Sequence, residues 1–421
     1  MRSISVFFAA LAVGSSDQAL SHLLIALIVI VIVARLLGTA AKTIGQPPVV
    51  GEMIAGILIG PSVMGHWLPR VSAFLFPSQV LPYLSAVSQI AVIFFMFLVG
   101  VDLDAGLLRQ KGGSSLVISQ ASIFAPFVLG AALAPWLYSS LSAPGVSFAV
   151  FALFLGISMS VTAFPVLARI LRDRQMHKSD LGTMALACAA VDDVIAWCLL
   201  AFVVGMASSG PRQALVTIAL TAAFIAIVLV VVRPVAVRFA RAQPVGGDAL
   251  QRTIVVVCIA AFLASVATDW IGIHVFFGAF LVGLVVPHDS PVALQIKSRF
   301  EDTVSALLLP VFFVLTGLRT QIGLIHGHRN WLICAVVIAV ASVGKVGGTY
   351  FAARFCGMTG RRAAALGVLM NARGLMELIV LNVGLDLGVL SPALFAMLVV
   401  MAVVTTFTTA PFLHLLAIEK P

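Results

Sequence analysis

The sequence predicts an all-α polytopic membrane protein with thirteen transmembrane helices in two inverted repeats. Three observations indicate this class: an apolar composition, apolar runs of membrane-crossing length, and an internal repeat. The 421 residues are 61% hydrophobic and 10% charged, and their mean hydropathy is +1.15. A soluble domain is nearer half apolar and a quarter charged, so a soluble fold is excluded.

The apolar runs are about 17–25 residues long, as helices that cross a hydrocarbon core of ~30 Å require. They lack the ten-residue alternation of an outer-membrane β-barrel. We expect the spans at residues 21–37, 47–61, 81–100, 113–137, 147–169, 179–206, 213–232, 253–268, 271–287, 301–318, 330–352, 363–385 and 391–418.

The basic residues predict the orientation of these spans. Thirteen spans put the termini on opposite sides, and 18 of the 25 Lys and Arg then fall in loops on one side and 5 on the other. The remaining two, Lys345 and Arg373, lie inside spans. Because basic loops stay in the cytoplasm, we expect a multi-pass protein of the cytoplasmic membrane with its N-terminus outside and its C-terminus inside. The net charge of +9 thus indicates topology and not nucleic-acid binding.

Residues 1–20 form an extracytoplasmic lead segment with a basic start and a short apolar stretch. The pattern fits a cleaved signal peptide and an interfacial lead-in equally well. The five cysteines form neither a CxxC pair nor a metal-ligand spacing, and we expect no cofactor.

An internal repeat relates the two halves of the chain. "IGQPPVVGEMIAGILIGP" begins at Ile44 and "IGIHVFFGAFLVGLVVP" begins at Ile271, with one isoleucine and three glycines matched at a constant offset of 227. "FFMFLVG" and "FFVLTG" follow in the same order. The offset spans seven helices, an odd number, so the copies have opposite orientation, as in secondary transporters. We expect repeats at 21–206 and 253–421, joined by a linker helix within 207–252.

Two predicted spans contain interruptions at matching places in the repeats. The first is "SVTAFPVLAR", from Ser160, where Pro165 removes a backbone donor; the second is "MNARGLMEL", from Met370, where Gly374 follows Asn371. A proline kink and a tolerated glycine are the simpler interpretation. We favour broken helices, because both segments offer polar side chains and free carbonyls to a cavity.

Some charged side chains at membrane depth are interpreted as structural. A charge at the bilayer centre costs about 2.5–3.5 kcal/mol, so it persists when it is paired or lines an ion path. Arg373 and Glu377 lie four residues apart on one helix and can neutralise each other. Glu52 follows Gly51 in a short glycine-rich span, and we assign it a structural role as well.

"AAVDDVIAW" places Asp192 and Asp193 side by side in an otherwise apolar run. Neighbours on a helix point about 100° apart, so the two carboxylates serve two partners more easily than one. Lys345 has no carboxylate near it in its own helix. We expect one aspartate to pair with Lys345 across the bundle and the other to face the cavity.

The cavity-facing carboxylate predicts coupled exchange. Burial disfavours the charged form of a carboxylate, so a proton and a small cation can compete for it. An alkali cation needs oxygen ligands, which Asp193, the Thr162 hydroxyl and freed backbone carbonyls would supply.

Four ordered motifs resemble one family: "GQPPVVGEMIAGILIGPSVMG", "TAFPVLARIL", "AAVDDVIAWCLLA" and "MNARGLMELIVLNVGL". Together they are similar to the monovalent cation:proton antiporter superfamily, in its second cation:proton antiporter branch, over nearly the whole chain. The resemblance implies a homodimer in the lipid bilayer, with scaffold helices in 21–100 and 253–318 and mobile core helices in 113–206 and 330–418. It also implies that Asp193 binds the ion and that Asp192 pairs with the lysine.

Many potassium-efflux relatives in this superfamily carry a cytoplasmic nucleotide-binding domain. Since the chain continues for only three residues beyond the last predicted span, we expect any such regulation to come from a separate cytoplasmic subunit.

The predicted function is exchange of Na⁺ or Li⁺ for protons, electrogenic and by elevator-like alternating access, with a role in pH homeostasis. K⁺/H⁺ exchange and a sodium-coupled symporter on the same architecture are the alternatives. An intramembrane aspartyl protease needs its two aspartates on different helices, and these are adjacent. A channel would need neither broken repeats nor a buried Lys–Asp pair.

Overall fold

The computed structural model describes residues 15–102, 105–242 and 248–416, and within these ranges every regular element is a helix. One isolated β-bridge joins Ser142 to Leu390. The helices of the first half are α2 (Ser15–Thr43), α3 (Pro48–Ile59), α4 (Met64–Trp67), α5 (Pro69–Leu75), α6 (Leu81–Asp102), α7 (Ala105–Leu141), α8 (Phe148–Ser160), α9 (Phe164–Asp173) and α10 (Asp180–Ile227). Then follow η1 (Val228–Val232), α11 (Arg233–Ala242), α12 (Asp248–Ile271), α13 (Val275–Val285), α14 (Pro291–Thr303), η2 (Val304–Leu308), α15 (Leu309–Arg319), η3 (Ile322–Leu324), α16 (Gly327–Phe355), α17 (Gly360–Met370), α18 (Leu375–Asp386) and α19 (Pro392–Leu415).

The length and composition of these helices agree with a polytopic membrane protein. In the described part of the chain, eleven helical segments are long and apolar enough to cross a membrane, or twelve when the bent pair α17–α18 counts as one. The predicted span 271–287 corresponds to α13, which has 11 residues and falls short of that length. The expected number of thirteen is therefore not reached by this criterion, although each predicted segment contains a helix in its described part.

Two predicted boundaries differ from the structure. The sequence places a loop between residues 206 and 213, around Gly210 and Pro211, but α10 continues through it to Ile227. Glycine and proline are tolerated inside membrane helices, because neighbouring groups satisfy the freed backbone atoms. The predicted span 301–318 is too short, because in the structure this span begins at Pro291 with α14. Hydropathy does not detect α14, since this helix carries several charged residues. Residues 1–14 of the predicted lead segment lie outside the described residues, and α2 begins at Ser15.

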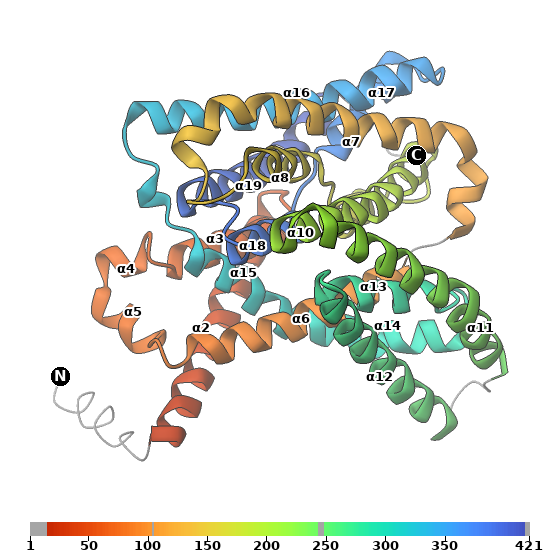
Figure 1. Cartoon of the computed structure of the whole chain (residues 1–421), viewed down its shortest axis with the longest axis horizontal. Coiled ribbons are helices and arrows are strands. Elements are labelled where there is room, and N and C mark those ends of the chain that lie inside the picture. Colours follow the sequence, from red (N-terminus) through yellow and green to blue (C-terminus); the bar gives the residue numbers. More distant parts are fainter. Residues whose placement is uncertain (1–14, 103–104, 243–247, 417–421) are drawn as a thin grey trace.

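The helices form two packed groups. In the core group, α7 packs against α8, α10 and α16, and α16 packs against α17 and α19. In the scaffold group, α3 packs against α2 and α15, and α13 packs against α6 and α12. Figure 1 shows α7 and α16 along one side of the molecule, α6, α12 and α14 along the opposite side, and α8, α18 and α19 between them.

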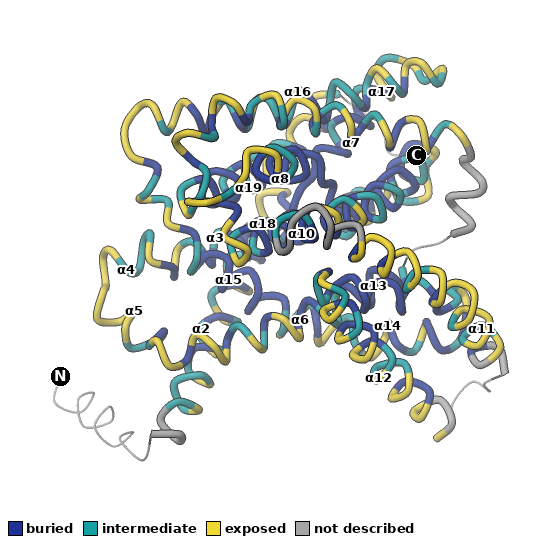
Figure 2. Tube along the Cα trace, viewed as in Figure 1, coloured by how far each residue is buried: buried dark blue, intermediate teal, exposed yellow. Residues whose placement is uncertain are grey.

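Burial is greatest where the helices are interrupted. In the span that contains α8 and α9, 83% of the residues in an apolar 18-residue stretch are buried. The same share is 33% for the span within α7. Figure 2 shows the same contrast, with buried residues concentrated in α8 and α18 and exposed ones along α12 and α16. The exposed residues of the outer helices are largely apolar, as lipid contact requires.

Glycines bring the scaffold helices into backbone contact. A Cβ added to Gly317 of α15 would lie 2.0 Å from the carbonyl carbon of Gly56 in α3. A Cβ added to Gly283 of α13 would lie 2.1 Å from the carbonyl oxygen of Phe97 in α6. Gly56 and Gly283 are equivalent in the predicted repeat, and each packs its helix against a helix of the other half. Small residues permit such close approach in membrane proteins.

Candidate functional site: two helix breaks and a buried charge cluster

The first break separates α8 from α9. α8 ends at Ser160, Val161 is extended at φ −64° and ψ 136°, and α9 begins at Phe164. Pro165 lies in the first turn of α9, where its missing N–H costs no helical hydrogen bond. The residue pattern therefore favours a restart of the helix after the break and not a simple kink.

The second break separates α17 from α18, which are bent by 44°. It contains Asn371, where α17 ends, and Gly374, where α18 begins. A Cβ on Gly374 would lie 2.6 Å from a methyl group of Val166 in α9, so the glycine permits close packing of one broken helix on the other.

The two breaks contact each other directly. The Ala163 N–H donates to the Ala372 carbonyl at 3.1 Å, and the Thr162 hydroxyl donates to the Met370 carbonyl at 3.3 Å. Backbone groups that the breaks remove from helical pairing are partly satisfied across this contact. We call the region formed by the two breaks the crossing.

Asp192 lies at the crossing with every oxygen engaged. Its Oδ1 accepts from Ser119 at 2.5 Å. Its Oδ2 accepts from Ser122 at 2.8 Å, from Thr162 at 2.8 Å and from the Lys345 ammonium at 3.0 Å. All five side chains are 0% exposed. Four donors thus satisfy both oxygens of this carboxylate.

Asp193 is equally buried and has a different environment. Among the described residues, neither of its carboxylate oxygens has a hydrogen-bond partner of standard geometry. The carboxylate lies near the backbone N–H of Phe164, at the N-terminus of α9, where the helix dipole favours an anion. A buried carboxylate without a partner is costly, so its oxygens are available to a proton or a cation.

Two cationic side chains lie at the C-terminal end of α8. Lys345 donates to the Ser160 carbonyl at 2.5 Å. Arg373 donates to the carbonyls of Ser158 at 3.0 Å and Met159 at 2.6 Å. Positive charge is favourable at a helix C-terminus, where carbonyls are unpaired. The break in α8 is thus stabilised by one lysine and one arginine from the second half of the chain.

The predicted pair of Arg373 and Glu377 is present at 3.2 Å, with both side chains fully buried. The second carboxylate oxygen of Glu377 and the side-chain oxygen of Asn371 are buried without a partner in the described structure. Glu52 lies on α3 and is 4% exposed, with the guanidinium groups of Arg35 and Arg169 as its neighbouring charges.

Two features of the site differ from, or go beyond, the sequence analysis. Thr162 was expected to be a cation ligand beside Asp193, but its hydroxyl donates to Asp192. Ser119 and Ser122 were not identified, although two serines three residues apart in an apolar helix are a signal that could have found them.

The oxygen atoms at the crossing suit an alkali cation better than a transition metal. In the described ranges, no three His, Cys, Asp or Glu side chains come together as a metal site. The unpartnered oxygens there belong to carboxylate and amide groups, which are hard ligands, and Nε of Arg373 is an unpartnered nitrogen that cannot bind a cation.

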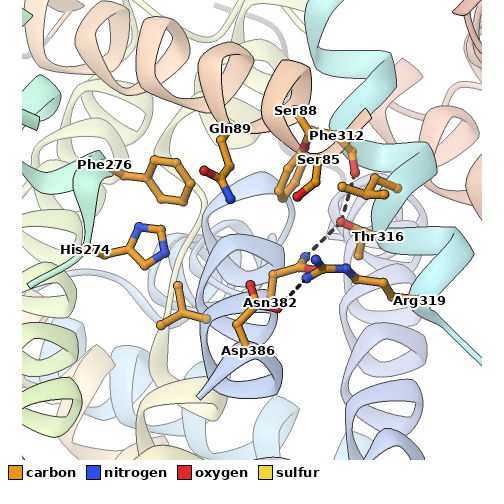
Figure 3. Close-up of a pocket in the computed structure, with 12 residues that line it drawn as sticks. Ser85, Ser88, Gln89, His274, Phe276, Phe312, Thr316, Arg319, Asn382 and Asp386 are labelled. Carbon is orange, nitrogen blue, oxygen red and sulfur yellow. Dashed lines mark hydrogen bonds and ion pairs between the residues drawn. The ribbon is translucent and has the colours of Figure 1, made fainter. Parts of the chain in front are cut away.

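A polar pocket lies between α6, α15 and α18 and the start of α13 (Figure 3). Arg319 of α15 pairs with Asp386 of α18 at 2.8 Å. Asn382 of α18 donates to the Thr316 hydroxyl of α15 at 2.9 Å. Because α18 packs against α8 and α19 of the core group, these contacts join the scaffold group to the core group away from the crossing.

Comparison with known proteins gives a consistent result. The model of a family described as "Sodium/hydrogen exchanger, transmembrane" matches residues 28–415. The chain is 43% identical over 390 residues to the Na(+)/H(+) antiporter NhaS4 of Synechocystis sp., and the match covers 91% of this chain and 94% of that protein.

Two eukaryotic relatives are longer than this chain. It is 39% identical over 410 residues to the cation/H(+) antiporter 19 of Arabidopsis thaliana and 31% identical over 417 residues to the K(+)/H(+) antiporter 1 of Saccharomyces cerevisiae. These matches cover 96% and 95% of this chain but 50% and 47% of the two relatives.

Among solved structures, the sodium proton antiporter MjNhaP1 of Methanocaldococcus jannaschii is similar, with a TM-score of 0.71. The match covers 96% of this chain and 98% of that one at 13% identity. At this identity the likeness shows the fold alone.

Proposed function

Because the chain belongs to the sodium/hydrogen exchanger family, and is thus a cation/proton antiporter and not an enzyme, we propose that it exchanges Na⁺ or Li⁺ for protons at Asp193. The observation that carries this proposal is a fully buried carboxylate that has no hydrogen bond of standard geometry among the described residues, next to a carboxylate with four donors. A proton or a cation would each relieve the unpaired charge of Asp193, and both cannot bind at once.

Asn371 is the proposed second ligand. Its side-chain oxygen is buried and unpartnered at the second break, and Thr162 of the first break bonds to the carbonyl of the preceding residue, Met370. A cation between the breaks would therefore meet oxygens from both repeats. The supporting residues are Ser160, Pro165 and Gly374. They keep the helices interrupted at the breaks and allow the two breaks to pack closely against each other.

The proposed stoichiometry is two protons for each cation. Asp193 carries one proton. Lys345 carries the second, because it is fully buried and depends on Asp192 for its charge. When a cation arrives and the Lys345–Asp192 contact loosens, the buried ammonium is less stabilised and releases its proton more readily. One cation against two protons moves net charge.

Transport by the purified protein in liposomes tests the ion and the stoichiometry together. We expect proton flux driven by Na⁺ or Li⁺ gradients to exceed that driven by K⁺, and to respond to a clamped potential of 100 mV, which is worth ~2.3 kcal/mol per charge. Flux that is indifferent to voltage would overturn the two-for-one scheme. Flux driven best by K⁺ would favour K⁺/H⁺ exchange, the activity for which the yeast relative is named.

A sodium-coupled symporter on the same architecture is the remaining alternative. Antiport moves protons outward when Na⁺ moves inward, whereas a symporter would move its solute with Na⁺ and no protons against it. The presence or absence of a Na⁺-driven proton flux in the same liposomes separates the two.

We further propose alternating access by movement of the core group against the scaffold group. The contacts of Arg319 with Asp386 and of Thr316 with Asn382 join the groups at one face and would have to separate. Oxidation of a Thr316→Cys/Asn382→Cys double variant, in a background without the five native cysteines, should stop exchange, and reduction should restore it. Each single cysteine variant is the control. Undiminished exchange in the cross-linked protein would exclude this movement.

The proposed orientation places the N-terminus outside and the C-terminus in the cytoplasm. In the same cysteine-free background, a membrane-impermeant thiol reagent should label Lys178→Cys only from the cytoplasmic side and His328→Cys only from the outside. Both positions are exposed. Labelling of both from one side would disprove the orientation and the inverted repeat.

Two proposals concern the assembled protein in its membrane. We propose a homodimer in the cytoplasmic membrane, with a role in pH homeostasis. The mass of the protein in lipid nanodiscs, and growth of a strain without the protein under alkaline sodium stress, are the corresponding measurements.

A further inference from the structure

Helices α7 and α10 run in fixed register beside the crossing. The Cys188 thiol donates to the Ser115 carbonyl at 3.5 Å, and one turn later the Ser119 hydroxyl donates to Asp192 at 2.5 Å. Both contacts join residues 73 apart in sequence. The repeat of one offset over successive turns shows parallel helices whose facing residues are matched, so Ser119 is held opposite Asp192 by the packing of the helices.

Ser122 extends this contact. It lies three residues after Ser119, on the same face of α7, and donates to the second oxygen of Asp192 at 2.8 Å. Both serines are 0% exposed. Each carboxylate oxygen of Asp192 therefore accepts a hydrogen bond from a hydroxyl of α7, in addition to the contact of Oδ2 with Lys345.

The charges around the pair are all in place to act on it. The Asp193 carboxyl and the neutral Cys188 thiol face the Asp192–Lys345 pair from α10, Arg373 faces it from the second break, and Glu377 faces it from α18. Of the two adjacent aspartates, Asp192 has its donors from α7 and the first break, whereas Asp193 has no hydrogen bond of standard geometry among the described residues. The serines are thus what distinguishes the two carboxylates on the side of α7.

We propose that Ser119 and Ser122 are positioning residues for exchange. They hold Asp192 as a carboxylate throughout the cycle and fix it toward Lys345, so that Lys345 and not Asp192 is the second group to gain and lose a proton. This inference rests on the proposed function of Asp193 and Lys345.

The direction of the effect follows from the states involved. When Lys345 releases its proton, Asp192 remains charged and keeps three hydroxyl donors. Without the serines this deprotonated state is less stable, because fewer donors offset the carboxylate charge. The pair then holds its proton more tightly, and the pH profile of exchange moves to more alkaline values.

The test measures cation-driven proton flux against pH for Ser119→Ala, Ser122→Ala and the double variant in liposomes. We expect an alkaline shift of about one pH unit for each serine removed. Ser119→Thr keeps a hydroxyl and should keep the wild-type profile. Ser140→Ala is the matched control, since Ser140 lies on the same helix. In the described structure its hydroxyl donates to the Leu137 carbonyl of its own turn.

A double variant with the wild-type profile would overturn the proposal. If the double variant fails to fold, the single variants and the threonine variant decide the outcome in the same way, because a structural role alone predicts no shift of the profile in the folded singles.

Infrared spectra provide a readout that does not depend on transport. Ionised and protonated carboxyls absorb at different frequencies, and the Asp192→Asn spectrum identifies the Asp192 band. In the wild type, we expect the Asp192 carboxyl to remain ionised over the pH range in which exchange varies. In the double serine variant, we expect either a protonated Asp192 band or a Lys345 that stays charged to higher pH. A wild-type Asp192 band that titrates with exchange would refute the inference. Loss of cation-driven flux in the wild type would instead disprove the proposed function and leave this spectral test standing.

Discussion

The crossing and the glycine contacts of the scaffold group are both tightly packed, but different atoms touch in each. At the crossing, the contacts are hydrogen bonds and ion pairs among buried side chains and freed carbonyls. In the scaffold group, Gly56 and Gly317 bring two helix backbones together without polar side chains. A polar contact can exchange one partner for another, such as a proton for a cation, whereas a backbone contact is kept or lost as a whole. The comparison indicates where change during transport is possible and where rigidity is required.

The largest effect is expected at the free carboxylate of the crossing. Asp193→Asn keeps the size of the side chain and removes its charge, so exchange should fall to background while the protein still folds. Cation-driven proton flux and the thermal unfolding temperature in one detergent are the measurements. Asp102→Asn is the matched control, because Asp102 pairs with Lys297 outside the crossing. Coupled exchange by Asp193→Asn would show that another group carries the proton.

The next effect tests the rigid half of the comparison. Gly317→Ala places a Cβ against the backbone of Gly56, which cannot move aside as a side chain could. We expect a loss of at least about 3 kcal/mol of stability, since overpacking of a well-packed interior is costly. Gly347→Ala on α16 is the control, because no atom lies within 4 Å of its added Cβ. That variant should be as stable as the wild type or more stable by up to about 1 kcal/mol. Equal unfolding temperatures for the two variants would refute the close backbone contact.

Lys345→Gln changes the coupling and not the ion site. It removes the proposed second proton carrier while Asp192 keeps its three hydroxyl donors. Surviving exchange should become one-for-one and lose its response to voltage. Lys297→Gln, at the surface end of the scaffold group, should retain the wild-type voltage response. If the Lys345→Gln protein still moves net charge, a residue other than Lys345 carries the second proton.

The smallest effect is expected for Thr162. Its hydroxyl donates to Asp192 in the structure, so Thr162→Ala should shift the pH profile by about one unit, as loss of one donor does, and leave the cation KM nearly unchanged. Thr162→Ser keeps the donor and is the control. A raised KM with an unchanged pH profile would restore the interpretation of Thr162 as a cation ligand.

Several features of the molecule follow from local sequence alone. The spans are predicted because hydropathy and length are properties of a single segment, and the two breaks are predicted because proline and glycine act on the backbone at their own positions. The pairing of Arg373 with Glu377 follows from helical spacing. The expectation of an ion site near Asp192 and Asp193 follows from the cost of two carboxylates at membrane depth.

Other features depend on which helix faces which, and only the tertiary structure decided them. The sequence left α10 divided where it is continuous, because Gly210 and Pro211 signal a turn that the helix does not make. It offered two adjacent aspartates of similar local context and could not assign their donors, since these come from residues 30, 70, 73 and 153 positions away. Helix rotation and register determine such contacts, and neither is encoded in the apolar pattern of a helix that is apolar all round. The difference between a satisfied Asp192 and a free Asp193 therefore arises from the packing of α7, α10 and α16 around the broken helices.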